Sequence, residues 1–376
     1  MGSLDVADTM EKTVLDVEVR LKPGTTCTTC TKLVKESVAR LLQSKQVQWR
    51  NFSGPVAFER GEDHFMDNHV ERVFVCERED KDSEDLASLP LLFWQVELKL
   101  HVYQLSLDEP CEEIEGDEEI ASFTEYFLPS VHFEGLWESL RFDDVFTDEC
   151  GGTLDVKTQL LNYSRSALLF SALRVNHNVI AWNRLILLHG PPGTGKTSLC
   201  KALAHKLSVR HFSANFHRPS SAAIAEESVH FSKLIEINAH SLFSKWFSES
   251  GKLVSKLFQQ IRDLAELALD LDSATGTRAD GNSGCGGETS GGRSLVFVLI
   301  DEVESLAVAR KQSIQGNEPS DGIRAVNALL TQLDQLREYP NVYVMCTSNV
   351  SDAIDEAFLD RADLQIHLGN PSLFAR

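Results

Sequence analysis

Residues 190–197 read Gly-Pro-Pro-Gly-Thr-Gly-Lys-Thr, which is the spacing of glycine, lysine and threonine found in phosphate-binding loops. The glycines let backbone N–H groups approach phosphate oxygens, and the start of a following helix adds a favourable dipole. Lys196 is expected to reach the β and γ phosphates, and Thr197 to ligate magnesium. An apolar run at residues 185–188 precedes the loop, as the motif requires. The loop therefore predicts a site for a nucleoside triphosphate and Mg²⁺.

A second apolar run, residues 295–300, is followed directly by Asp301 and Glu302. Carboxylates at the end of a buried strand lie where ligands bind in open α/β sheets. We expect Asp301 to hold the magnesium ion and Glu302 to act as general base toward the attacking water. The alternative is that the acidic pair only complements a helix N-terminus. The residues expected to bind nucleotide and metal are Gly190, Pro191, Pro192, Gly193, Thr194, Gly195, Lys196, Thr197 and Asp301.

Two polar residues farther along the chain complete the predicted catalytic set with Glu302. Asn349 follows a third apolar run, residues 341–346, and is expected to orient the attacking water from between the other two strand ends. Arg361 lies in an acidic segment and is hypothesised to act as an arginine finger on a γ-phosphate bound by a neighbouring subunit. The alternative for Arg361 is a local ion pair with Asp360 or Asp363, which would contribute little at a surface.

A sheet is needed to position these groups. The apolar runs that precede them are continuous rather than alternating, which is typical of parallel strands buried on both faces, and residues 234–237 form another such run. The predicted fold class is α/β, with a parallel sheet flanked by helices. Before it, residues 14–21 and 95–102 alternate like half-buried strands and residues 32–43 have helical spacing. A smaller mixed α+β domain is therefore expected to precede the sheet.

The order of phosphate loop, acidic strand end, strand-end asparagine and late arginine resembles that of an AAA+ ATPase. Segments before and between these motifs are similar to the pachytene checkpoint protein family. The similar segments are residues 133–137 (Phe-Glu-Gly-Leu-Trp), 182–184 (Trp-Asn-Arg), 234–252 and 301–306. The resemblance runs from about Phe133 to about Gly369 and implies that the nucleotide is ATP.

Membership of that family implies a hexameric ring that remodels HORMA-domain proteins together with a HORMA adaptor. It further implies roles in meiotic chromosome synapsis, recombination and the spindle checkpoint, in the nucleus and on chromosomes, with the cytoplasm as a further compartment. Members carry an N-terminal substrate-recruiting domain, a large α/β subdomain and a small helical subdomain.

In the family, the position of Lys245, Trp246 and Phe247 lies in the central pore. An aromatic side chain among serines can grip a peptide through apolar contact without reading its sequence. The alternative is a tryptophan buried in the core.

Residues 370–376 are all that follow Gly369, so the C-terminal helical lid of the family is expected to be absent. In AAA+ proteins this lid closes over the nucleotide. Two hypotheses therefore stand. The chain is an ATP-dependent remodeller, or it is a lid-less, non-hydrolysing docking or regulatory subunit that binds nucleotide or full-length ring subunits.

The chain is expected to divide into several regions. These are residues 1–129 for substrate recruitment with an acidic loop at 108–119, 130–180 for a linker and helix, 181–370 for the large α/β subdomain, and 371–376 for a tail. Two insertions in the subdomain are expected at residues 211–231 and 273–292, and the second, rich in glycine and serine, is predicted to be a flexible surface loop.

The composition limits the classes of partner. A formal net charge of −20 over 376 residues argues against a direct nucleic-acid grip, which needs a clustered positive face. No apolar stretch approaches the roughly 18 residues of a membrane span, so no membrane association is predicted.

Overall fold

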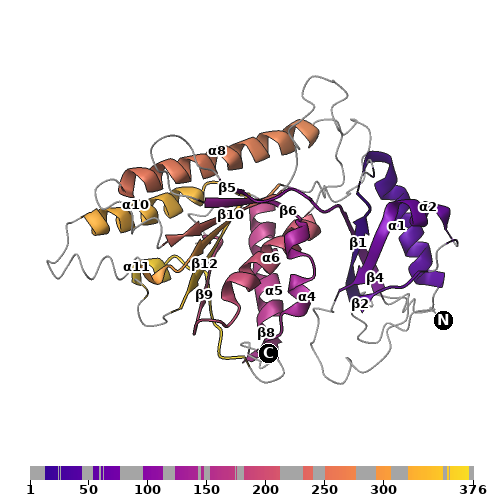
Figure 1. Cartoon of the computed structure of the whole chain (residues 1–376), viewed down its shortest axis with the longest axis horizontal. Helices are drawn as coiled ribbons and strands as arrows, with labels where there is room; N and C mark the ends of the chain where they lie inside the picture. The colour runs from indigo at the N-terminus through magenta and orange to yellow at the C-terminus, as the bar shows by residue number, and fades with distance from the viewer. Residues whose placement is uncertain are drawn as a thin grey trace, which may run out of the picture. The chain divides into compact units, whose positions relative to one another are not determined.

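The computed structural model divides the described chain into two units, of which the first ends at Leu105 and the second begins at Ser106 (Figure 1). The residues that the structure describes are 13–23, 25, 27–44, 54–58, 61, 63–76, 96–112, 123–142, 145–147, 153–173, 175, 182–211, 232–239, 250–276, 294–305, 321–349, 354 and 356–371.

The first unit is a four-stranded sheet covered by a helix, with strand order β2-β3-β1-β4. Its elements are β1 (Thr13–Leu21), α1 (Cys27–Ser44), β2 (Gly54–Pro55), α2 (His64–His69), β3 (Val70–Val75) and β4 (Val96–Tyr103). Strand β1 pairs antiparallel with β3 and parallel with β4. Val34, Val38 and Leu42 follow one another at a helical spacing of four and join the same buried cluster as Val17 and Val19 of β1. The expected mixed α+β domain is therefore present.

The second unit is built on a seven-stranded sheet of order β13-β9-β12-β11-β10-β6-β5. Its strands are β5 (Cys111–Glu112), β6 (Phe123–Leu128), β9 (Leu185–His189), β10 (Ser232–Asn238), β11 (Val296–Asp301), β12 (Val342–Ser348) and β13 (Leu364–His367), with a separate hairpin of β7 (Val145–Thr147) and β8 (Thr153–Asp155). Its helices are η2 (Val131–Phe133), α4 (Leu136–Ser139), α5 (Val156–Ala172), α6 (Lys196–His211), α8 (Ser250–Gly276), α10 (Asp321–Leu336) and α11 (Glu356–Leu359). The five strands from β13 to β10 are parallel, whereas β6 and β5 add antiparallel pairs at one edge.

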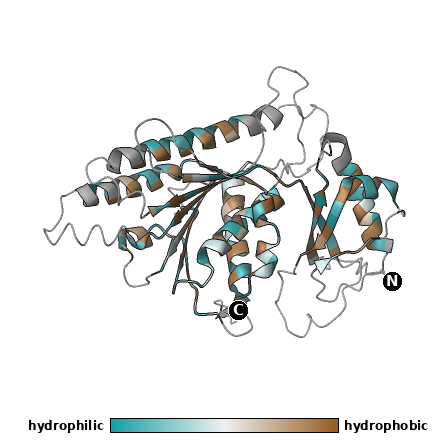
Figure 2. Ribbon diagram, viewed as in Figure 1, coloured by the Kyte–Doolittle hydropathy of each residue, from teal (hydrophilic) through white to brown (hydrophobic). Residues whose placement is uncertain are grey.

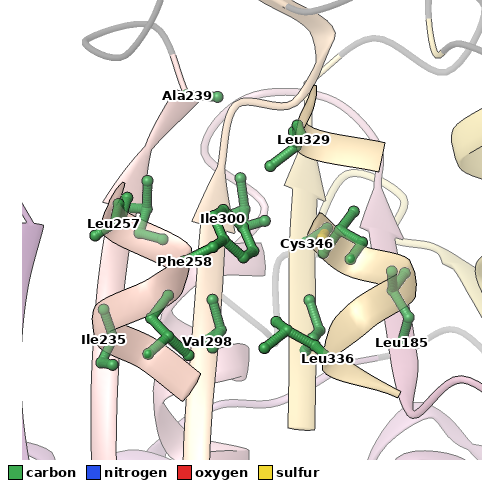
Figure 3. Packing of buried hydrophobic residues seen from close by; sticks show 14 of the residues in the cluster. Leu185, Ile235, Ala239, Leu257, Phe258, Val298, Ile300, Leu329, Leu336 and Cys346 are labelled. Carbon is green, nitrogen blue, oxygen red and sulfur yellow. The ribbon is translucent and has the colours of Figure 1, made fainter. Parts of the chain in front are cut away.

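Both faces of the central strands are buried. Ile235 of β10 and Val298 of β11 pack against α8 and α10, as Figure 3 shows for Leu257, Phe258 and other members of this cluster. The intervening residues of the same strands belong to a second cluster with α5 and α6, on the opposite face of the sheet in Figure 1. Figure 2 shows hydrophilic and hydrophobic residues in turn along α8 and α10. This two-sided burial confirms the α/β class that the continuous apolar runs predicted.

Arg184 joins the start of β9 to the end of α10. It is 2% exposed, and its guanidinium donates hydrogen bonds to the carbonyls of Val342 (2.9 Å), Arg337 (2.8 Å) and Tyr339 (2.9 Å). Burial lowers the pKa of Arg184 to about 10, which still leaves it charged at neutral pH. The residue has φ of 56°, and its N–H donates to the carboxylate of Asp363 at 2.7 Å.

The division between units lies earlier in the chain than the expected end of the N-terminal domain at residue 129. The reason is that β6 pairs with β10 over Phe123–Leu128, so this segment belongs to the seven-stranded sheet. Helix α8 continues to Gly276, so the expected loop at 273–292 begins with helical residues. Residues 277–292 and residues 212–231 of the two expected insertions lie outside the described residues.

Within the part of the chain that is described, no helix combines the length and apolar character required to cross a bilayer.

We predict that Arg184→Met lowers the free energy of unfolding by roughly 2–4 kcal/mol, because several buried carbonyls lose their donor. Urea unfolding of the variant and the unmodified chain measures this. Arg337→Met is the matched control, since Arg337 makes a partly exposed ion pair with Asp334 and its loss should cost about 1 kcal/mol or less. Equal effects of the two substitutions would contradict the role given to Arg184.

Candidate active site

The phosphate loop, Asn349 and the acidic pair lie at the carboxyl ends of three neighbouring strands. Strand β12 pairs in parallel with β9 on one side and with β11 on the other. The phosphate loop after β9, residues 347–349 at the end of β12 and the acidic pair at the end of β11 therefore lie at neighbouring strand ends. The sheet order confirms that the strand leading to Asn349 lies between the other two.

Three glycines give the phosphate loop its shape. Gly190, Gly193 and Gly195 have φ of 146°, 78° and 86°, values that residues with a Cβ rarely adopt. The Gly190 N–H donates to the carbonyl of Ser348 at 3.1 Å, which ties the loop to the end of β12. A Cβ on Gly190 would lie 2.1 Å from the carbonyl oxygen of Leu368, so no larger residue fits there without a backbone shift.

Lys196 is the buried cation of the loop. Its side chain is folded back, and Nζ donates to the carbonyls of Gly190 (2.9 Å) and Pro191 (2.7 Å) and to Oγ1 of Thr194 (3.4 Å). Burial lowers the pKa of Lys196, and the nearby carboxylates of Glu304 and Asp301 partly offset this effect. Among the described residues, the oxygens that accept hydrogen bonds from Nζ are neutral. A buried ammonium held by neutral oxygens suits an anionic ligand such as a phosphate chain.

His189 precedes the loop and lies against His367 at the end of β13, with ring centroids 5.2 Å apart. Burial lowers the pKa of His189, and the neighbouring His367 and Lys196 lower it further. The imidazole is therefore mainly neutral at pH 7 and adds little positive charge beside Lys196.

Thr197 and Asp301 provide oxygen donors for a divalent cation. The Thr197 hydroxyl donates to Oδ1 of Asp301 at 3.0 Å and to Oδ2 at 3.3 Å, so the two groups expected to hold magnesium are in contact. The described residues contain no group of three or more His, Cys, Asp or Glu side chains that could hold a metal ion. Magnesium does not need one, because it is commonly held by one carboxylate together with substrate phosphates and water. The donors present fit Mg²⁺ bound with a nucleotide.

Glu302 follows Asp301 in an unusual backbone conformation. Its φ is 61°, in the left-handed region that a residue with a side chain adopts at a cost of about 1 kcal/mol or more. Its carbonyl accepts hydrogen bonds from the N–H (3.2 Å) and hydroxyl (2.9 Å) of Ser305. A strained residue beside a predicted metal ligand is consistent with a catalytic position.

Asn349 is the residue after β12 and is partly buried. Its position next to the ends of β9 and β11 is the one that the expected water-orienting role requires, and the role itself stays a prediction.

Arg361 forms an ion pair inside its own chain, with a partner other than those expected. Its guanidinium donates to both carboxylate oxygens of Asp334 on α10, at 2.9 and 2.8 Å. The suggested partner Asp363 instead accepts hydrogen bonds from the hydroxyl of Tyr163 and from the backbone N–H groups of Asn183 and Arg184. The Arg361 side chain keeps 23% of its surface exposed, so it remains within reach of another molecule.

Two residues at the site carried no assigned role in the sequence. Asp334 is 27 residues from Arg361 along the chain, and no local motif links the two. Thr347 lies two residues before Asn349, but nothing in the sequence predicts its contact with Asp301. The expected pore residues Lys245, Trp246 and Phe247 lie outside the described residues.

Comparison with known proteins agrees with this geometry. Residues 186–370 match the ATPase family associated with various cellular activities (AAA), and residues 10–108 match the TRIP13 N-terminal domain. The chain is 45% identical over 366 residues to the pachytene checkpoint protein 2 homolog of Arabidopsis thaliana, covering 97% of this chain and 66% of that protein. It is 40% identical over 370 residues to the homolog of Gallus gallus, covering 98% and 72%. The chain belongs to the pachytene checkpoint protein 2 family.

A solved structure of a family member has the same fold. The structure of C. elegans PCH-2 matches with a TM-score of 0.63 and 32% identity, covering 96% of this chain and 74% of that chain. The described fold is thus that of the pachytene checkpoint protein 2 family. The chain spans just under two thirds of the length of the Arabidopsis relative.

We predict that Lys196→Ala weakens binding of ATP by roughly 10- to 100-fold, because a charge-assisted hydrogen bond to phosphate is lost. Isothermal titration with Mg·ATP measures the change. Lys201→Ala on the same helix is the control, since Lys201 pairs with Glu236 at 2.7 Å and its loss should change affinity by about twofold or less. Unchanged affinity in the Lys196 variant would remove the loop from the binding site.

Proposed function

We propose that the chain hydrolyses ATP as part of an AAA+ ring that remodels HORMA-domain proteins. The observation that carries this proposal is the meeting of Lys196, the Thr197–Asp301 pair and Glu302 at neighbouring ends of parallel strands. Hydrolysis of a phosphoanhydride needs a cation for the phosphates, ligands for magnesium and a base for water. The fold brings side chains of these three kinds to the carboxyl ends of neighbouring strands.

The chemistry follows from what each side chain can do. Magnesium, when bound with ATP, neutralises charge on the β and γ phosphates. The Lys196 ammonium and the loop N–H groups bind phosphate oxygens. Glu302 accepts a proton from the water that attacks the γ-phosphorus, with Asn349 orienting that water. The bond between the γ-phosphorus and its bridging oxygen breaks, and ADP and phosphate leave.

Arg361 is proposed to act on the nucleotide of a neighbouring subunit. Its guanidinium is bound to Asp334 on α10, and part of its surface stays exposed. A fixed cation beside the γ-phosphate of another subunit would stabilise charge that develops during hydrolysis. This arrangement requires a ring, and a hexamer is the assembly proposed.

Family membership supports the proposed substrates. Both the AAA region and the TRIP13 N-terminal domain are matched, and we propose that the N-terminal domain recruits substrate. We propose HORMA-domain proteins and a HORMA adaptor as partners, in meiotic synapsis, recombination and the spindle checkpoint. The proposed location is the nucleus and chromosomes. Lys245, Trp246 and Phe247 are proposed to grip the substrate in the pore.

We predict that Glu302→Gln leaves Mg·ATP affinity within a few-fold of the unmodified chain and lowers turnover by about 100-fold or more, because the general base is lost. Phosphate release at saturating ATP, followed beside an affinity titration, measures both quantities.

Conversion of a purified HORMA-domain protein between its conformers, with the adaptor present, is the second readout for this variant. It should fall in parallel with turnover. Full hydrolysis by the glutamine variant would exclude Glu302 as the base. Hydrolysis without any HORMA conversion by the unmodified chain would exclude the substrate class and leave the ATPase assignment standing.

We predict that Arg361→Ala and Glu302→Gln chains, each nearly inactive alone, regain measurable turnover when mixed. In a mixed ring some interfaces join an intact Glu302 from one chain to an intact Arg361 from the other. Phosphate release across a series of mixing ratios measures the recovery, and particle mass confirms that mixed rings form. If mixed rings stay inactive, Arg361 does not act between subunits.

A further inference from the structure

Thr347 contacts both members of the acidic pair. Its hydroxyl donates a hydrogen bond to Oδ1 of Asp301 and accepts one from the N–H of Glu302 at 3.4 Å. Its backbone carbonyl accepts a further hydrogen bond from the N–H of Val303 at 3.0 Å. One residue of β12 therefore contacts three consecutive residues at the end of the neighbouring strand β11.

The position of Thr347 leaves its hydroxyl little freedom. The residue is 2% exposed and lies in the middle strand of the three that build the site. A hydroxyl carries one proton to donate and lone pairs to accept, and Thr347 uses it in both ways. A valine has nearly the same shape and fills the same space, so shape alone does not require a threonine here.

Asp301 accepts hydroxyl hydrogen bonds from two elements. Thr197 donates from the start of α6 and Thr347 donates from β12. Both hydroxyls reach Oδ1 of Asp301. Thr197 is also a proposed ligand of magnesium, whereas Thr347 is a donor that does not bind the cation. Mutation of a group that orients a metal ligand typically lowers metal affinity or activity by about 10- to 100-fold.

Glu302 needs support for its backbone as well. With φ of 61° it occupies a conformation that a glutamate does not adopt readily. The hydrogen bonds from the N–H groups of Glu302 and Val303 to Thr347 hold the chain on both sides of the Glu302 carbonyl. Without the hydroxyl, one of these restraints is lost and the residue is freer to relax toward an ordinary conformation.

We propose that Thr347 is a positioning residue that orients Asp301 for the cation and holds Glu302 in its catalytic conformation. The inference rests on the proposed function, since it assigns Thr347 a task in the same site. Thr347 itself does not touch the reacting atoms.

Two substitutions separate the hydroxyl from the methyl group. Thr347→Val keeps the volume and loses the hydroxyl, whereas Thr347→Ser keeps the hydroxyl and loses the methyl. The first measurement is binding of a fluorescent, non-hydrolysable ATP analogue during titration with MgCl₂, and again in EDTA. For Thr347→Val we expect the Mg²⁺ concentration for half-maximal effect to rise by about 10- to 100-fold. Binding in EDTA should stay unchanged, and Thr347→Ser should follow the unmodified chain.

Turnover supplies the second readout. At saturating Mg²⁺, Thr347→Val should lower kcat by about 10-fold or more while KM for ATP stays nearly constant, because Glu302 is displaced and the phosphate loop is not. A merely structural role would instead impair the serine variant, which leaves a cavity, and would spare the valine variant.

The outcomes distinguish this inference from the proposed function. If the unmodified chain has no turnover, hydrolysis fails as a proposal, while the MgCl₂ titration still decides the role of Thr347. A thermal unfolding curve shows whether Thr347→Val folds, and Thr347→Ala carries the same expectation if it does not. A folded variant without the hydroxyl that keeps the Mg²⁺ dependence of the unmodified chain would overturn the inference, as would a serine variant as impaired as the valine one.

Discussion

Parallel pairing of β12 with both β9 and β11 is the interaction on which the site depends. It brings a phosphate loop and an acidic pair, separated by about a hundred residues of chain, together at the carboxyl ends of the strands. It also explains why Gly190 and Val303 both donate hydrogen bonds to backbone carbonyls at the end of β12, one from each side. The end of β12 thus fixes the phosphate loop and the metal-binding segment relative to each other.

Much of this arrangement could be predicted because the signals are local. The glycines of the loop require backbone conformations that other residues avoid, so their spacing alone indicates the turn. The uninterrupted apolar runs before Gly190, Asp301 and Thr347 indicate strands covered on both faces, and the two hydrophobic clusters confirm it. The strand-to-helix order then places the site at the carboxyl ends of the strands.

Other features depend on packing between distant segments and leave no local pattern. The partner of Arg361 is Asp334, on a helix that the sequence does not link to it, whereas nearby Asp363 is committed to Asn183 and Arg184. The sequence places the segment of β6 in the N-terminal domain, which is expected to end at residue 129. The structure pairs β6 antiparallel with β10, and nothing in so short a segment indicates that pairing. In each case the hydrogen bonds join residues far apart in the chain, and the periodic patterns that indicate helices and strands do not report such pairs.

Gly190 is usually explained by the phosphate it faces, but here the atom that crowds its missing side chain belongs to the protein. The carbonyl of Leu368, just after β13, occupies the space that a Cβ would need, while the N–H of Leu368 donates to His189. The first glycine of the loop is therefore required by the close packing of β9 against β13, whether or not a ligand binds. Intolerance to substitution at this position would persist in a relative that had lost all use for nucleotide, so the presence of a glycine there is weak evidence of an active enzyme.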